Sequence, residues 1–228
     1  MKITSAIICV YNEEKTIRDV VLSVFESTFL GEIIVVNDGS TDNTKKIIEE
    51  LKDELRISTI HLKKNRGKGY AMAIGIENAT NEIIVFIYAD LSNRRKEHFA
   101  QLVAPVLNEE ADMVLGQATE TLINYSINPF KSFTGERALF RKDVLPLVDK
   151  MKDSRFGVET LLNLYYQSQG KTVKYVMLKK LQHPTKFDKV SKLLAVKEFI
   201  QEGNEIAITA FKNFHLVTGS IKKQLKIS

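Results

Sequence analysis

The stretch Val35-Val36-Asn37-Asp38-Gly39-Ser40-Thr41-Asp42 marks the end of a buried strand and the start of a polar turn. The apolar run that begins at Ile33 stops at an amide and a carboxylate, and the small polar residues after Gly39 can cap a following helix. In open α/β sheets ligands bind beyond the carboxyl ends of the strands, so Asp38 is placed to meet a ligand. Because Asp-Gly is also an ordinary turn pair, this interpretation depends on the residues at the ends of the other strands.

Composition narrows the class of protein. With 228 residues, 44% of them hydrophobic, the chain can bury the core of one domain, or of one domain with an appendage. The single cysteine, Cys9, lies in an apolar run, which excludes an internal disulfide framework and indicates a reducing compartment. No leader and no apolar stretch near the ~18 residues of a membrane span are present. We therefore expect a cytoplasmic protein, soluble or peripheral on the inner face of the membrane.

The charge of the chain bears on its partners. The formal net charge of +5 is spread over many lysines and glutamates, and no nucleic-acid-binding motif occurs, so we expect no nucleic-acid partner. The charge suits an anionic small molecule, such as a nucleotide diphosphate, or a phosphate at a membrane surface. The sequence leaves a homodimer open.

Strand-like and helix-like segments alternate through the first half of the chain. Apolar runs predict strands, and helical periodicity predicts the helices between them. The expected strands span residues 4–10, 32–37, 57–62, 83–87 and 113–115, and the expected helices 13–25, 40–55, 70–79 and 96–107. Asn12 is a candidate N-cap of the first helix. The alternation predicts an α/β fold with a doubly wound, mainly parallel sheet and a Rossmann-like nucleotide-binding half.

The second half is less regular. Residues 117–133 show no sustained period and predict a long loop near the site, whereas residues 134–139 predict the start of a short helix. Residues 173–178 predict a last strand at the sheet edge, because lysines interrupt it. From Lys189 onward an apolar helical stripe runs among lysines, which predicts either packing on the domain or contact with a membrane surface.

Motifs of several other chemistries are absent from the sequence. Gly67-Lys68-Gly69 lacks the lead and the Ser/Thr of a P-loop, and no Gly-x-Gly-x-x-Gly follows the first strand. A Gly-x-Ser-x-Gly nucleophile elbow is also missing. ATP hydrolysis and dinucleotide redox chemistry are therefore disfavoured. A nucleotidyltransferase is disfavoured too, because Tyr11-Asn12-Glu13 stands where such an enzyme has a glycine-rich segment.

Four polar motifs follow the first four expected strands, in chain order. They are Val10-Tyr11-Asn12-Glu13, Val36-Asn37-Asp38-Gly39-Ser40-Thr41-Asp42, Asn65-Arg66-Gly67-Lys68-Gly69-Tyr70-Ala71 and Ala89-Asp90-Leu91-Ser92. In this order, and over roughly the first half of the chain, they resemble the family 2 glycosyltransferases of the GT-A fold. The resemblance implies a GT-A domain at residues 1–186, with a donor half at 1–117 and an acceptor half at 118–186. Residues 187–228 then form a C-terminal amphipathic helical extension.

The resemblance implies a nucleotide-sugar donor site at these strand ends. Lys68 would lie near the base or the diphosphate, and Asp38 could accept the imide hydrogen of uracil, which favours UDP. Asp90 corresponds to the metal-binding residue of the family's Asp-x-Asp motif and would hold Mg²⁺ or Mn²⁺; its alternative role is a turn or helix cap. The implied donor-binding residues are Val10, Tyr11, Asn12, Glu13, Asp38, Lys68 and Ala89.

One residue departs from the family pattern. Tyr88 stands where the motif has its first Asp, and a phenol cannot replace a carboxylate beside a cation. Three explanations remain open: Asp90 suffices, the enzyme is weakened, or the protein binds a sugar nucleotide without turnover. We favour the first.

The acceptor half carries two further motifs. Thr134-Gly135-Glu136-Arg137-Ala138 and Phe156-Gly157-Val158-Glu159 resemble acceptor-side motifs of the polyprenyl-phosphate (dolichyl-phosphate type) sugar transferases and the glucosyl-3-phosphoglycerate synthases. By this resemblance Gly135 and Glu136 bind the acceptor, Arg137 and Glu159 act in catalysis with Asp90, and His183 is a second metal ligand. Their alternatives are a helix-terminal carboxylate for Glu159, a surface ion pair for Arg137 and a structural role for His183.

The expected activity is that of a hexosyltransferase. A sugar would pass from a nucleotide-diphosphate donor, with UDP favoured, to a phosphate-bearing acceptor such as polyprenyl phosphate. Transfer to a small soluble acceptor such as phosphoglycerate is the alternative. The sequence leaves inversion or retention at the sugar open.

Overall fold

One seven-stranded sheet carries the fold, in the order β3-β2-β1-β4-β6-β5-β7. The computed structural model describes residues 4–27, 31–91, 93–118, 136–179, 181, 207–209 and 211–225. The strands are β1 (Thr4–Val10), β2 (Glu32–Asn37), β3 (Ser58–His61), β4 (Ile83–Tyr88), β5 (Met113–Ala118), β6 (Arg137–Phe140) and β7 (Val173–Leu178). All neighbouring strands pair in parallel except β6, which is antiparallel to both β4 and β5.

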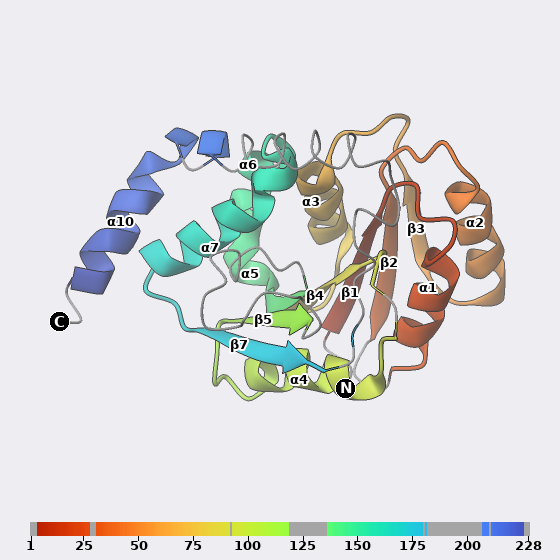
Figure 1. Cartoon of the computed structure of the whole chain (residues 1–228), viewed down its shortest axis with the longest axis horizontal. Coiled ribbons are helices and arrows are strands. Elements are labelled where there is room, and N and C mark those ends of the chain that lie inside the picture. Colours follow the sequence, from red (N-terminus) through yellow and green to blue (C-terminus); the bar gives the residue numbers. More distant parts are fainter. Residues whose placement is uncertain are drawn as a thin grey trace.

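Helices cover both faces of this sheet (Figure 1). The longer ones are α1 (Ile17–Phe25), α2 (Thr44–Glu54), α3 (Lys68–Asn78), α4 (Lys96–Leu107), α7 (Val158–Ser168) and α10 (Phe214–Leu225). The shorter ones are α5 (Arg141–Val144), η3 (Leu145–Leu147), α6 (Val148–Lys152) and η4 (Arg155–Gly157). In Figure 1, α1 and α2 lie at one end of the molecule and α10 lies at the other, beside α7.

The apolar strands hold these layers together because their side chains alternate between two cores. Ile8 of β1 points into the core formed with α1, α2 and α4, whereas Ile7 points into the core formed with α3, α5, α6 and α7. This explains why β1, β2 and β4 are continuous apolar runs rather than alternating ones. The predicted α/β fold with a doubly wound, mainly parallel sheet is confirmed.

The expected short helix over residues 134–139 is wrong. Residues 137–140 instead form β6, which pairs with β4 on one side and with β5 on the other. Ala138 and Leu139 are fully buried in opposite cores, as a central strand requires. The tertiary setting thus overrides the helix propensity of Ala and Leu, and the helix begins only at Arg141.

The C-terminal segment is described only in part. Residues 182–206, which include much of the predicted amphipathic stripe, lie outside the described residues. Within α10, Leu216 is buried in the core that α7 also lines, so this part of the segment packs on the domain. No helix in the described portion of the chain has both the length and the apolar character that crossing a membrane requires.

Close packing of α3 on β1 predicts a stability effect at Gly75. A Cβ added there would clash with Cγ2 of Ile7, so the helix or the strand would have to shift. We expect Gly75→Ala to lower the free energy of unfolding by about 1–3 kcal/mol, although alanine favours a helix, because overpacking outweighs propensity. Urea unfolding measures this. Gly219→Ala in α10, where the nearest atom is Ser168 Cβ at 3.2 Å, is the control. A Gly75→Ala variant more stable than the wild type would contradict the prediction.

Candidate active site

The carboxyl ends of β1, β2 and β4 meet at one edge of the sheet because these strands are parallel neighbours. The turn after β1 is joined to the turn after β2 by backbone and side-chain hydrogen bonds. The Asn12 N–H donates to Ser40 Oγ at 2.9 Å, and the Thr41 N–H donates to Asn12 Oδ1 at 2.8 Å. Asn12 adopts a left-handed conformation, with φ of 54°. It therefore binds the neighbouring turn, and its expected role as N-cap is wrong, since α1 begins only at Ile17.

Asp38 anchors the loop that leads into α3. Its Oδ1 accepts the N–H of Arg66 at 2.7 Å, and its Oδ2 accepts the N–H of Gly67 at 2.8 Å. Burial raises the pKa of Asp38, and the two N–H groups oppose that shift. In the structure this carboxylate positions the loop that carries Lys68, and its predicted contact with the base stays a prediction.

Lys68, Tyr88 and Glu159 form one cluster, built from α3, β4 and α7. The Lys68 ammonium and the Tyr88 hydroxyl both donate hydrogen bonds to Oε1 of Glu159. Lys68 Nζ also lies 3.4 Å from the centroid of the Tyr88 ring, a cation–π contact. The Glu159 side chain is only 9% exposed and that of Lys68 20%. Glu159 does lie in the first turn of α7, as its helix-terminal alternative requires. Its side chain, however, is bound by Lys68 and Tyr88 from two other elements, so the helix end does not account for its position.

Electrostatics keep Glu159 ionised and Tyr88 neutral. Burial alone would raise the pKa of Glu159, but Lys68, Arg137 and the two hydrogen bonds lower it below the usual value. Burial, followed by the charge of Glu159, raises the pKa of Tyr88 well above the usual value. A neutral phenol therefore donates to an ionised carboxylate. Beside them in the sheet, burial raises the pKa of the Cys9 thiol to about 12, so this cysteine stays protonated.

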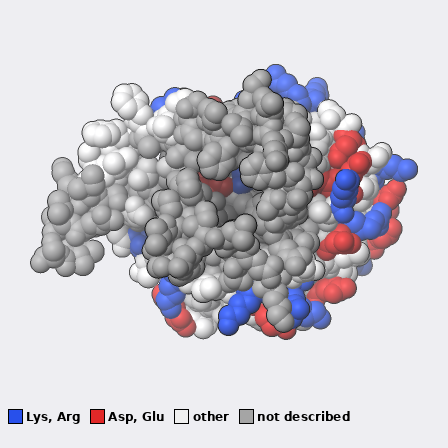
Figure 2. Space-filling view, in the orientation of Figure 1, with Lys and Arg blue, Asp and Glu red and all other residues white. Residues whose placement is uncertain are grey.

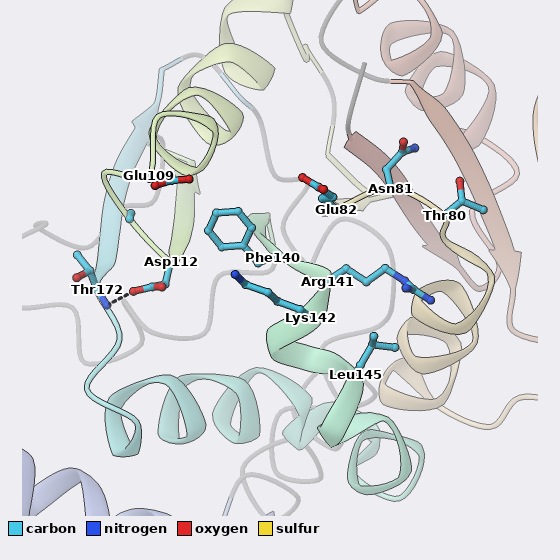
Figure 3. A pocket seen from close by; sticks show the side chains of 11 residues that line it. Thr80, Asn81, Glu82, Glu109, Asp112, Phe140, Arg141, Lys142, Leu145 and Thr172 are labelled. Atoms are coloured by element: carbon cyan, nitrogen blue, oxygen red, sulfur yellow. Dashed lines mark hydrogen bonds between the residues drawn. The ribbon is translucent and has the colours of Figure 1, made fainter. Parts of the chain in front are cut away.

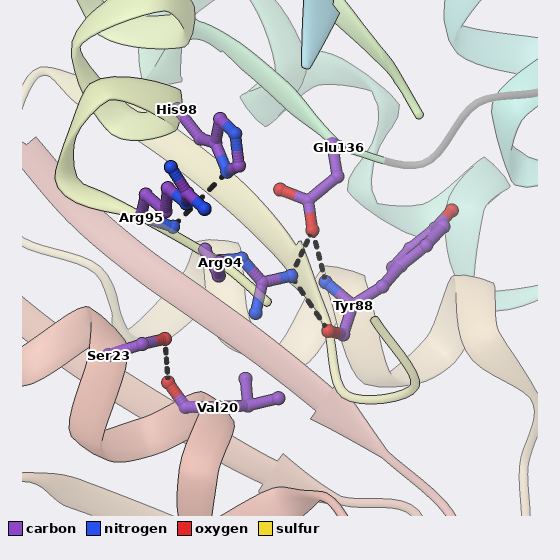
Figure 4. A network of polar contacts seen from close by, with 7 residues as sticks. All are labelled: Val20, Ser23, Tyr88, Arg94, Arg95, His98 and Glu136. Carbon is purple, nitrogen blue, oxygen red and sulfur yellow. Dashed lines mark hydrogen bonds and ion pairs between the residues drawn. The ribbon is translucent and has the colours of Figure 1, made fainter. Parts of the chain in front are cut away.

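A second buried ion pair fixes the end of β4 (Figure 4). Arg94 pairs with Glu136, and the Arg94 guanidinium also donates to the Tyr88 carbonyl at 3.1 Å. Oε1 of Glu136 accepts the Tyr88 N–H at 3.2 Å. The side chains of Arg94 and Glu136 are 2% and 3% exposed. Glu136, predicted to bind the acceptor, thus holds the Tyr88 backbone, and sequence reasoning missed Arg94, whose only signal was its place shortly after Asp90.

Arg137 lies inside the sheet rather than at the surface. It is fully buried in β6, so the surface ion pair proposed as its alternative is wrong. Its charge reaches the cluster, where it lowers the pKa of Glu159. A role as a ligand of the acceptor phosphate stays a prediction.

Asp90, the predicted metal ligand, lies at this edge of the sheet, and its metal role stays a prediction. Ala89 before it is buried, and Asp90 itself is half-buried just after β4. In the described residues, the surroundings of Asp90 included, no group of three or more His, Cys, Asp or Glu side chains is placed to hold a metal ion. His183 and Gly135 lie outside the described residues. Because Mg²⁺ is usually held by one or two carboxylates together with substrate phosphates, Asp90 suits a cation that binds with a diphosphate.

A cavity of about 650 Å³ lies at the opposite edge of the sheet. Glu82, Asp112 and Thr172, at the starts of β4, β5 and β7, line it together with Arg141 and Lys142 (Figure 3). Asp112 is already bound there by the Thr172 N–H at 2.8 Å. Since ligands of open α/β sheets bind at the carboxyl ends of the strands, this cavity is separate from the candidate active site.

Comparison with known proteins identifies the family. Residues 5–159 match the sequence model of glycosyl transferase family 2. This stretch contains every predicted site residue except His183. The chain belongs to glycosyl transferase family 2. Solved structures show that its fold is the GT-A fold. The chain aligns with glucosyl-3-phosphoglycerate synthase from Mycobacterium tuberculosis in complex with Mn²⁺, UDP and phosphoglyceric acid, with a TM-score of 0.72 and 20% identity, over 92% of this chain and 78% of that one.

Curated relatives of this family 2 member align over a shorter stretch. A poly-β-1,6-N-acetyl-D-glucosamine synthase from Staphylococcus epidermidis is 39% identical over 87 residues, which is 38% of this chain and 21% of that protein. The corresponding synthase from Staphylococcus aureus (strain COL) is 37% identical over 89 residues, or 39% of this chain and 21% of that protein. The chain thus matches about a fifth of the length of these relatives.

The two hydrogen bonds that Asp38 accepts predict a cost for Asp38→Asn. An amide offers one acceptor oxygen and turns its NH₂ group toward a backbone donor, so one N–H of the loop loses its partner. We expect the free energy of unfolding to fall by about 1–3 kcal/mol. Urea unfolding measures the change, and Asp53→Asn on the exposed side of α2 serves as the control. Equal effects of the two substitutions would contradict the anchoring role.

The lowered pKa of Glu159 predicts a pH-dependent stability. Because its folded pKa lies below the unfolded value of about 4.3, its stabilising contribution is present above that pH and is lost as the pH falls through the folded pKa. We expect Glu159→Gln to destabilise the protein by about 2 kcal/mol at neutral pH and by progressively less below about pH 4.

Urea unfolding between about pH 3 and about pH 7, a range that brackets the unfolded Glu pKa, tests this prediction. Glu77→Gln, which breaks the more exposed pair with Lys152, is the control and should change stability little, since exposed pairs are screened. A pH-independent difference between the wild type and Glu159→Gln would overturn the electrostatic interpretation.

Proposed function

We propose that this chain transfers a sugar from a nucleotide-diphosphate sugar, with a UDP-sugar favoured, to a phosphate-bearing acceptor such as polyprenyl phosphate. The observation that carries the proposal is the Lys68–Glu159–Tyr88 cluster beside Asp90 at the carboxyl edge of the sheet. It brings an ionised carboxylate and a cation from the two halves of the domain to one place. Family membership and the UDP bound in the structurally similar synthase support the choice of donor.

The donor is proposed to bind across the turns after β1 and β2. The Asn12–Thr41 and Asn12–Ser40 hydrogen bonds make these turns one rigid surface for the base and ribose. Val10, Tyr11 and Glu13 adjoin Asn12 in the sequence, and Ala89 follows β4, the neighbour of β1 in the sheet. Asp38 positions the loop that is proposed to direct Lys68 toward the diphosphate.

Asp90 is proposed to hold Mg²⁺ or Mn²⁺, the ions bound with UDP in the similar synthases. When bound, the cation offsets the charge on the departing diphosphate. His183 stays a proposed second ligand. Lys68 adds a protein cation near the same group, and its side chain is already held by Glu159 rather than free to rotate.

Glu159 and Arg137 are proposed to act on the acceptor side. During transfer the bond from the sugar's anomeric carbon to the diphosphate oxygen breaks, and an acceptor oxygen bonds to that carbon. A hydroxyl acceptor releases a proton, which Glu159 Oε2 could take, because Oε1 is bound by Lys68 and Tyr88. A phosphate acceptor is already anionic and needs no base, so Glu159 then serves chiefly to hold Lys68. Glu136 and Gly135 are proposed to lie along the acceptor.

A small soluble acceptor is the second candidate. The similar synthase binds phosphoglyceric acid, a phosphorylated acid without a lipid chain. A sugar-nucleotide-binding protein without turnover is the third, favoured by Tyr88 in place of a carboxylate. Sugar transfer to polyprenyl phosphate supports the first candidate and transfer to phosphoglycerate the second. Transfer to neither acceptor supports the third.

Thermal shift with UDP and GDP, each with and without Mn²⁺, tests the donor site. We expect UDP and Mn²⁺ together to raise the melting temperature more than either alone, because the ion and the diphosphate share one site. A rise in melting temperature with GDP but not with UDP would overturn the choice of uracil as the base. Stabilisation that is independent of Mn²⁺ would overturn the metal role.

Turnover of UDP-sugar by variants at two positions tests the roles of Asp90 and Tyr88. We expect Asp90→Ala to lose activity by about 100-fold or more, since metal stabilisation of the leaving group is worth several kcal/mol. The matched Tyr88→Phe variant keeps the ring and removes only the hydroxyl bound to Glu159. Unchanged turnover in Asp90→Ala would contradict the proposed metal role of Asp90. Donor binding by the wild type without any turnover would favour the third candidate, a sugar-nucleotide-binding protein. In that case Tyr88→Asp should gain activity.

A further inference from the structure

The end of the chain has an unusual charge pattern. Residues 206–228 contain four lysines, Lys212, Lys222, Lys223 and Lys226, and no Asp or Glu. Elsewhere lysines and acidic residues are interspersed, and Figure 2 shows this mixture over the end of the molecule that carries α1 and α2. At the opposite end the described surface is mostly white in Figure 2, and Lys212 is the one lysine among residues 207–209 and 211–219.

The described residues at this end form a helical surface with two faces. Thr209, Asn213 and Leu216 are buried, and Leu216 packs in the core that α7 also lines. The Asn213 N–H donates to the Thr209 carbonyl at 3.1 Å, which links the helical residues 207–209 and 211–212 to α10. This buried face fixes the direction in which the other side chains point.

The opposite face exposes large apolar side chains. Ile208 is 51% exposed, Phe211 82% and Phe214 63%. Their spacing of three residues puts them on one side of the helix, and the exposed Lys212 lies between them in the chain. No other residues in the described ranges expose aromatic rings to this extent. Clustered exposed rings mark an interaction site more often than scattered single ones do.

We propose that the face formed by Ile208, Phe211 and Phe214, called here the aromatic face, docks on an anionic lipid membrane. Aromatic and aliphatic side chains of an interfacial helix bury about 5–10 Å into the headgroup boundary while lysines contact lipid phosphates. The acid-free, lysine-bearing stretch supplies the charge complementarity. A second copy of the chain fits less well, because protein interfaces are depleted in lysine and need about 800 Å² per partner, more than three side chains cover.

The chain offers a direct probe, since it contains no tryptophan. Phe211→Trp places a single indole in the aromatic face, and Phe25→Trp places one at the 46% exposed end of α1 as the control. The full-length protein is mixed with vesicles of phosphatidylcholine alone or with added phosphatidylglycerol. We expect the emission of Phe211→Trp to shift to the blue only with the anionic vesicles, and that of Phe25→Trp to stay unchanged. Inorganic phosphate should cause no shift, which separates a bilayer from a free anion.

Vesicle co-sedimentation supplies the second measurement. We expect the double variant Phe211→Ser/Phe214→Ser to weaken binding about tenfold or more, because each buried Phe contributes at least that factor. Lys212→Glu tests the charge alone and should weaken binding chiefly at low salt. Unchanged melting temperatures confirm that these exposed substitutions leave the fold intact.

Three outcomes of the vesicle-binding measurements would overturn the proposal. They are the absence of binding to anionic vesicles, equal binding to neutral ones, and binding that survives the double serine substitution. A Phe211→Trp shift that appears without vesicles and grows with protein concentration would also overturn it, and would assign the aromatic face to a dimer. None of these measurements requires donor, acceptor or turnover, so they stand or fall apart from the proposed transferase activity.

Discussion

The ion pair between Lys68 and Glu159 joins the two halves of the candidate site. Lys68 belongs to the loop and helix that Asp38 positions, and Glu159 lies in the first turn of α7, the helix that packs on the other part of the sheet. A buried ion pair costs desolvation, so it persists only where further hydrogen bonds compensate. Here the Tyr88 hydroxyl supplies one. The geometry of the strand ends therefore depends on a charge balance as much as on packing.

Tyr88 gains a physical explanation from this balance. An Asp at its position would add a second negative charge to the surroundings of Glu159 and would lack the hydroxyl that donates to it. Neighbouring like charges raise the pKa of a carboxyl group. The phenol instead donates to Glu159 and leaves Asp90 as the carboxylate of the β4 end. The Arg94–Glu136 pair binds both the N–H and the carbonyl of Tyr88 and so fixes the position of the Tyr88 backbone.

The sequence predicted those features of the molecule that depend on residues close together in the chain, and it missed those that depend on contacts between distant residues. The apolar runs of β1, β2 and β4 and the helix at residues 96–107 were predictable because each is defined by its own side chains. β6 was not, since its identity as a strand comes from β4 and β5 rather than from its four residues. Tyr88 could be singled out from the sequence, but its bond to Glu159 spans 71 residues and no local pattern encodes it. The same holds for Arg94 and Glu136, 42 residues apart.

The reversed direction of β6 has a consequence for how such a protein can vary. β5 ends at Ala118 and β6 begins at Arg137, and because the two strands are antiparallel both points lie at the edge that carries Asp90. The chain thus leaves the sheet and re-enters it on the same side. A change in the length of the connection between them leaves every strand pairing intact. Because each doubling of a flexible loop costs only about 0.6 kcal/mol in closure entropy, the length of this connection can vary with little loss of stability.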